Sequence, residues 1–177
     1  RREPVALLQE AYFSAVVELR NKQLSNFLVR VSQFQEQALQ HCVMQYLGFG
    51  VPSVYAETAA FWQRLQQRSA LYAYLKDDRS SGYELKLSGF PNRLVLLAIL
   101  RFGQDERLAA LEVLGQFCER RNRYVHKFEG VSELTQTSES LRAMRSLLDA
   151  LDGNTENKPF NRLNHAIEEQ LAAVMQD

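Results

Sequence analysis

Cysteine, net charge and long apolar runs are all scarce in this chain of 177 residues. Its two cysteines, Cys42 and Cys118, lie far apart and form no disulfide framework, so we expect reduced thiols in a cytoplasmic protein. The 21 basic and 21 acidic side chains cancel, which excludes a whole-molecule attraction to nucleic acid and leaves only local patches. The apolar run at 94–100 is too short to span a bilayer, and we expect no membrane contact.

Sequence motifs of the common enzyme classes are also missing. The chain has no glycine-rich phosphate loop, no G-x-S-x-G elbow and no spacing typical of a zinc or calcium site. The acidic pair Asp77 and Asp78 is better explained by a helix end followed by a turn. His41 lies in an apolar helical pattern and is interpreted as structural, and His165 is interpreted as a surface residue. We therefore expect neither a metal nor a cofactor.

Apolar residues recur every three or four positions over almost the whole chain, which is the spacing of one helix face. With a hydrophobic fraction of 46%, this pattern predicts one all-α domain, a bundle of six to seven helices. Residues 5–47 form either one long helix or two joined near 21–25. The other predicted helices cover 55–75, 92–102, a stretch that begins after Asp105, 132–151 and 160–174.

Several helix ends have local signals. Gly48 can take the left-handed conformation that closes a helix, Asn92 can cap the start of the next apolar helix, and Gly103 can stop it. Residues 77–91 form the one clearly irregular region, a lid or a loop. Within it, residues 83–87 alternate like a short strand, although a single strand would have few partners in a helical domain.

The stretch CERRNRYVHKF, residues 118–128, gathers positive charge in an otherwise neutral protein. Guanidinium groups match phosphate oxygens, and a histidine titrates near neutral pH and can act as a general acid or base. An asparagine can fix the histidine tautomer or bind a substrate oxygen. The candidate site residues are therefore Arg120, Arg121, Asn122, Arg123, His126 and Lys127. A solvated helical face is the simpler interpretation of the same pattern.

Helical geometry sorts these residues into two groups. Asn122 and His126 are four apart and share a face, whereas Arg121 is five before His126, about 140° away. Arg121 therefore reaches the same substrate only through its long side chain or a local irregularity. The difficulty disappears if two copies of the chain pack about a two-fold axis and share one groove.

The run Arg121-Asn122-Arg123-Tyr124-Val125-His126 resembles the R-N-x-x-x-H signature of HEPN domains. The order of helices is similar to the C-terminal ribonuclease half of the type III CRISPR-associated accessory ribonucleases of the Csm/Csx group. This resemblance implies a homodimer that cleaves single-stranded RNA without metal in antiviral defence. It also implies proton transfer by His126, phosphate binding by Arg121 and a supporting role for Asn122, with the 2′-hydroxyl as nucleophile.

Full-length members of that group also carry an N-terminal CARF domain that binds cyclic oligoadenylate. Nothing in 1–177 resembles such a domain, and the chain begins at Arg1 without a methionine. We therefore expect residues 1–177 to be a single HEPN-like domain cut from a longer protein. Cyclic oligoadenylate would then act only through the missing N-terminal part.

Three other interpretations stay open at this point. The chain could be a catalytically silent HEPN-like module that binds nucleic acid or nucleotide, or that only dimerises. It could be a HEPN toxin controlled by a separate antitoxin. It could also be a purely structural helical domain in which 118–128 is a solvated face. The sequence does not indicate which RNA sequence would be preferred.

Overall fold

A computed structural model of the chain describes residues 4–78, 84–127 and 135–152, with side chains to 119 in the second stretch and to 151 in the third. These residues form seven α-helices and one short 3₁₀-helix, without strands, so the predicted all-α bundle is confirmed. The predicted helix at 160–174 lies outside them. The elements are α1 (Pro4–Arg20), α2 (Leu24–Leu47), η1 (Tyr55–Glu57), α3 (Thr58–Gln66), α4 (Ser69–Asp77), α5 (Arg93–Phe102), α6 (Leu108–Lys127) and α7 (Thr137–Asp152).

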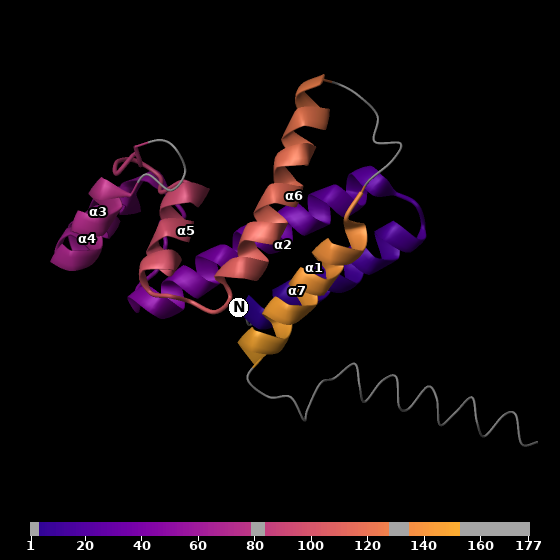
Figure 1. Ribbon diagram of the computed structural model, residues 1–177, viewed down its shortest axis with the longest axis horizontal. Coiled ribbons are helices and arrows are strands. Elements are labelled where there is room, and N and C mark those ends of the chain that lie inside the picture. The colour runs from indigo at the N-terminus through magenta and orange to yellow at the C-terminus, as the bar shows by residue number, and fades with distance from the viewer. Residues whose placement is uncertain (1–3, 79–83, 128–134, 153–177) are drawn as a thin grey trace, which may run out of the picture.

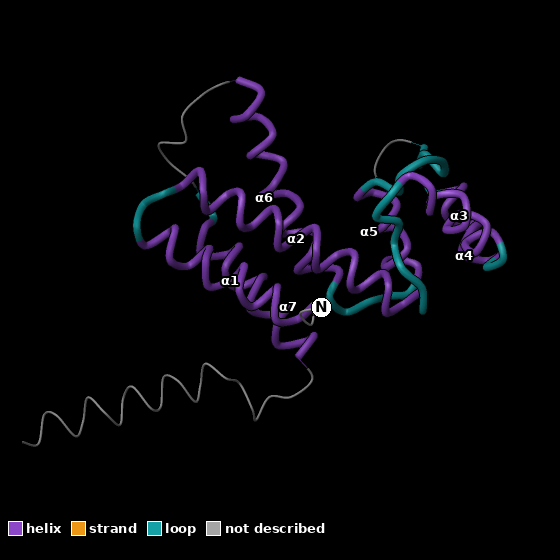
Figure 2. The backbone as a smooth tube through the Cα atoms, turned by 180° about the vertical axis from the view of Figure 1, so that it is seen from behind, coloured by secondary structure: helices purple, strands orange, loops and turns teal. Residues whose placement is uncertain are grey.

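The helices form two connected groups. Helices α1, α2 and α7 lie alongside one another, and α6 crosses α2 (Figure 1). Helices α3, α4 and α5 gather near the C-terminal end of α2. The same arrangement is seen from behind in Figure 2, where the C-terminal end of α6 again extends beyond its neighbours. Helix α6 therefore has one end inside the bundle and the other outside it.

The core is centred on α2 and α5. Phe27, Val31 and Phe34 of α2 are fully buried, and the Phe27 ring meets the Phe117 ring of α6 edge to face at 5.8 Å. All six residues from Val95 to Leu100 in α5 are buried. The apolar run at 94–100 thus belongs to a core helix. No helix within the described ranges has both the length and the apolar character needed to cross a membrane.

The region 5–47 is two helices, the second of the two predicted alternatives. The chain turns between α1 and α2 at Lys22, which takes a left-handed φ of 59°. Gly48 ends α2 as predicted, with φ 72° and its N–H donated to the Met44 carbonyl at 2.8 Å. Asn92 also caps α5 as predicted, because its side chain accepts a hydrogen bond from the Val95 N–H at 3.1 Å.

The single helix predicted over 55–75 is wrong, because the region is divided into η1, α3 and α4. The break between α3 and α4 falls at Arg68, whose φ of −89° and ψ of 72° are not helical. The Arg68 guanidinium donates to the Leu47 carbonyl at the end of α2 and lies over the Phe49 ring at 5.8 Å. A contact distant in sequence therefore accompanies an interruption of the local helical pattern.

Two further boundaries differ from the prediction. The helix predicted over 132–151 begins at Thr137, directly after Gln136, which takes a left-handed φ of 63°; residues 132–134 lie outside the described residues. Residues 84–87 do not form a strand. Asp78 at the exit of α4 is buried and pairs with Arg101 at 3.4 Å, which gives this acidic residue a structural partner.

Candidate functional site

The RNRYVH motif lies in the last two turns of α6. This helix starts where the Asp105 side chain accepts the Arg107 N–H at 2.9 Å, and it packs Leu111, Leu114 and Phe117 into the core. From there the helical backbone continues without a break to Lys127. All six predicted site residues fall in this final part, and their side chains lie outside the described residues: Arg120, Arg121, Asn122, Arg123, His126 and Lys127.

The unbroken helix fixes which positions share a side of α6. At 100° per residue, position 121 falls one turn after Phe117, on the side that packs against α2. Positions 122 and 126 fall instead on the side of Glu112 and Glu119. The angle of about 140° between positions 121 and 126 is therefore not reduced by any local irregularity in the backbone.

The end of α6 that carries the motif lies at the edge of the described helices. In Figures 1 and 2 the final turns of α6 extend past α2 and the other drawn helices. The N-terminal part of the helix is held in the bundle through α2, α5 and α7. The backbone of α6 that carries the motif thus lies away from the core of the described helices.

A polar pocket lies further down α6, on the same side as positions 122 and 126. Its volume is about 250 Å³, and it is bounded by α5, α6 and the segment after α4. Arg101 pairs with Glu112 across the pocket at 3.0 Å. Arg93 pairs with Glu119, which lies about one turn beyond Gly115 on α6. Sequence reasoning missed this pocket. The available signal was Gly115, a glycine inside a helical pattern, which often marks a close approach.

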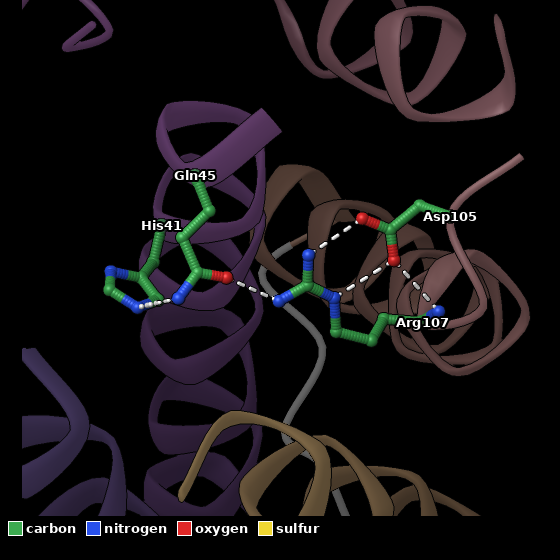
Figure 3. Close-up of polar contacts among 4 residues, drawn as sticks. All are labelled: His41, Gln45, Asp105 and Arg107. Atoms are coloured by element: carbon green, nitrogen blue, oxygen red, sulfur yellow. Dashed lines mark hydrogen bonds and ion pairs between the residues drawn. The ribbon is translucent and has the colours of Figure 1, made fainter. Parts of the chain in front are cut away.

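A second polar network lies near the N-terminal end of α6 (Figure 3). Arg107 pairs with Asp105 at 2.7 Å and also donates to Oε1, the side-chain amide oxygen of Gln45. The Gln45 amide nitrogen lies 3.1 Å from Nε2 of His41. Position 126 is nineteen residues beyond Arg107, about 28 Å along the helix axis. His41 thus belongs to a network that joins α2 to the start of α6, remote from the motif.

Donor and acceptor chemistry determines the charge of His41. Arginine only donates hydrogen bonds, so the Gln45 oxygen must face Arg107 and its amide nitrogen must face His41. Nε2 of His41 must then accept, which requires a neutral ring protonated on Nδ1. Burial, with a further contribution from the charge of Arg107, lowers the pKa of His41, in agreement with this assignment.

The Cys42 thiol is not an activated nucleophile. Cys42 is fully buried, and burial raises the pKa of its thiol to about 11. Cys118 is half-buried, and the two cysteines form no disulfide with each other. Across the described ranges, no three His, Cys, Asp or Glu side chains come together as a metal site.

Comparison of the chain with protein-family models, curated proteins and solved structures gave no match in any of the three.

Proposed function

We propose that the chain is a metal-independent HEPN-type endoribonuclease that cleaves single-stranded RNA at a site shared by two copies. The observation that carries this proposal is the position of RNRYVH on the end of α6 that extends beyond the bundle. Positions 121 and 126 lie on different sides of one continuous helix. A second copy related by a two-fold axis can bring an arginine from one chain next to a histidine from the other.

The proposed reaction needs only groups from the RNA and the two chains. The 2′-hydroxyl attacks the adjacent phosphorus, the bond to the 5′-oxygen breaks, and the products are a 2′,3′-cyclic phosphate and a 5′-hydroxyl. His126 transfers the proton from the 2′-hydroxyl to the leaving 5′-oxygen, and Arg121 stabilises the negative charge on the phosphate. Asn122 supports these two residues. Arg120, Arg123 and Lys127 would hold the neighbouring phosphates.

The resemblance extends the proposal to biological context. The ribonuclease would act in CRISPR-linked antiviral defence in the cytoplasm. Cyclic oligoadenylate would act only through a separate sensory domain, as the resemblance implies. The homodimer, in contrast, is a direct requirement of the composite site.

The first test is cleavage of a fluorescent single-stranded RNA in excess EDTA. The wild-type protein should cut, and His126→Ala should lower the rate by about 10²- to 10⁴-fold, because general acid–base catalysis is lost. His41→Ala is the matched control and should remain within a few-fold, since His41 belongs to the remote network. Equal cutting by wild type and His126→Ala would contradict the proposal, as would loss of activity in His41→Ala with a folded protein.

A silent RNA-binding module is the second candidate, and the local charge favours it. Four of the eight positions from 120 to 127 are arginine or lysine, which is sufficient for phosphate binding without any catalysis. In that case neither protein would cut. Both wild type and His126→Ala would bind RNA with an affinity that falls steeply as salt is raised.

A further inference from the structure

We propose that the pocket between α5 and α6 binds one nucleobase of the RNA strand. This inference deepens the proposed function, since it treats the base as part of the same substrate. The pocket lies within a single chain, so its binding properties do not depend on dimerisation. Its polar lining residues include Asp78, Arg93, Arg101, Glu112 and Gln116.

The pocket is aligned with the motif along α6. Glu112, Gln116 and Glu119 fall within about 60° of one another on the helix, and position 126 falls about 20° from Glu119. Position 126 is ten residues beyond Gln116, about 15 Å along the axis. That distance corresponds to about four to five stacked nucleotides, and fewer in an extended strand. One RNA strand could therefore contact both the motif and the pocket.

The charges of the pocket favour a neutral ligand over a phosphate. Arg101 pairs with both Asp78 and Glu112, at 3.4 and 3.0 Å, and Arg93 pairs with Glu119. Two guanidinium groups thus face three carboxylates. A phosphate would be repelled by the carboxylates, whereas a neutral group exchanges hydrogen bonds with both kinds of side chain.

The mixture of side chains suits a flat polar ring. Leu85, Leu94 and Leu97 supply apolar surface, Arg93 and Arg101 supply donors, and Glu112 supplies acceptors. Nucleobases combine apolar faces with edges that both donate and accept. Arginine, glutamate and glutamine side chains are common partners for such edges, and unstacked RNA bases are commonly read in this way. Gln116 is exposed and adds an amide that both donates and accepts.

Gly115 makes room for the Arg93 side chain at the pocket. A Cβ atom at this position would lie 2.7 Å from Nη1 of Arg93, closer than side chains normally approach. The absence of a side chain therefore lets Arg93 lie across α6 toward Glu119. Gly115→Ala should displace Arg93 and alter the pocket, and the flexible arginine end can move without unfolding the helix.

The test is titration of the ¹⁵N-labelled full chain with adenosine, guanosine, cytidine and uridine, followed by NMR. At least one nucleoside should shift the Gly115 backbone and Gln116 side-chain signals in a saturable way. Gln116→Leu should lower the affinity for that nucleoside roughly two- to tenfold, because hydrogen bonds are lost. Gly115→Ala should lower the affinity as well. Gln63→Leu, an exposed glutamine in the middle of α3, is the matched control and should bind as wild type.

Two results would overturn this inference. One is the absence of saturable shifts with all four nucleosides at millimolar concentration. The other is inorganic phosphate producing the same shifts and displacing the nucleoside, which would make the pocket an anion site. Because no cleavage is measured, nucleoside binding without ribonuclease activity would reject the proposed reaction and leave the base pocket supported.

Discussion

At the residue scale, His41 shows how a hydrogen-bond chain sets a protonation state. Arg107 donates a hydrogen bond to Gln45, and Gln45 donates one to His41. Reversing the Gln45 side chain would place its amide donor against the donors of Arg107. Nδ1 of His41 is buried and has no hydrogen-bond partner among the residues that the structure describes. A proton added to Nε2 would have to break the link to Gln45. The network is therefore compatible only with the neutral ring.

This arrangement predicts a dependence of stability on pH. The pKa of His41 is lowered from 6.5 in the folded state, so the unfolded chain binds the proton first. The contribution of neutral His41 to the free energy of unfolding is therefore fully present above pH 6.5. It is lost as the pH falls from 6.5 toward the lower pKa that His41 has in the folded state. Urea unfolding should show a larger fall in the free energy of unfolding between about pH 7.5 and 5.5 for wild type than for His41→Gln.

The comparison of the two proteins isolates this histidine, since other titrating groups contribute equally to both. Between about pH 7.5 and 8.5 the ring is neutral in both folded and unfolded chains, and the difference between wild type and His41→Gln should stay constant. An equal fall in both proteins on acidification would show that His41 does not titrate between folded and unfolded states as described.

At the element scale, the end of α5 depends on packing more than on backbone freedom. The helix stops at Gly103 as the sequence predicts, yet Gly103 has an ordinary φ of −75° and the left-handed residue is Gln104, at 51°. A Cβ on Gly103 would lie 2.5 Å from the Tyr46 ring of α2. Glycine is therefore needed because two segments approach closely.

Gly103→Ala should lower the free energy of unfolding by about 1–3 kcal/mol, the usual cost of overpacking. Urea or thermal unfolding measures this change. Gly50→Ala is the control, because a Cβ there meets nothing within 4 Å and its φ is not left-handed. If Gly103→Ala were as stable as Gly50→Ala, the Tyr46 ring would have to move aside at no cost, contrary to the packing described.

At the scale of the whole molecule, the composite site makes a prediction about mixed dimers. Arg121→Ala and His126→Ala should each be inactive alone. When the two variants are unfolded together and refolded, half of the dimers contain one chain of each variant. Each such dimer has two arginine–histidine pairs formed between its chains, and one of the two pairs is intact. The mixture should therefore recover about a quarter of wild-type cleavage. Refolding each variant separately is the control.

A mixture that stays inactive while forming mixed dimers would contradict an arginine and a histidine contributed by different chains. The dimer content is measured independently by mass photometry or by a size difference between tagged and untagged chains. If either single variant cleaves RNA, the residue changed in that variant is not required for the reaction. These outcomes separate the requirement for two copies from the identity of the catalytic groups.

The sequence by itself determined the helical class, most helix positions and the place of the motif near a helix end. It could do so because helices are local structures, and apolar spacing, Asn92 and Gly48 act within a few residues. It also indicated that positions 122 and 126 share a face of α6, since that follows from the helical repeat alone.

Only the tertiary structure decided the break at Arg68, the pocket beside Gly115 and the course of the end of α6 beyond the other described helices. Each depends on contacts between residues far apart in the chain: Arg68 with Leu47, and Arg93 with Glu119. No local pattern contains such pairs, because they arise when helices are packed together. The same packing leaves the last turns of α6 beyond α2, where a second chain and an RNA strand could meet.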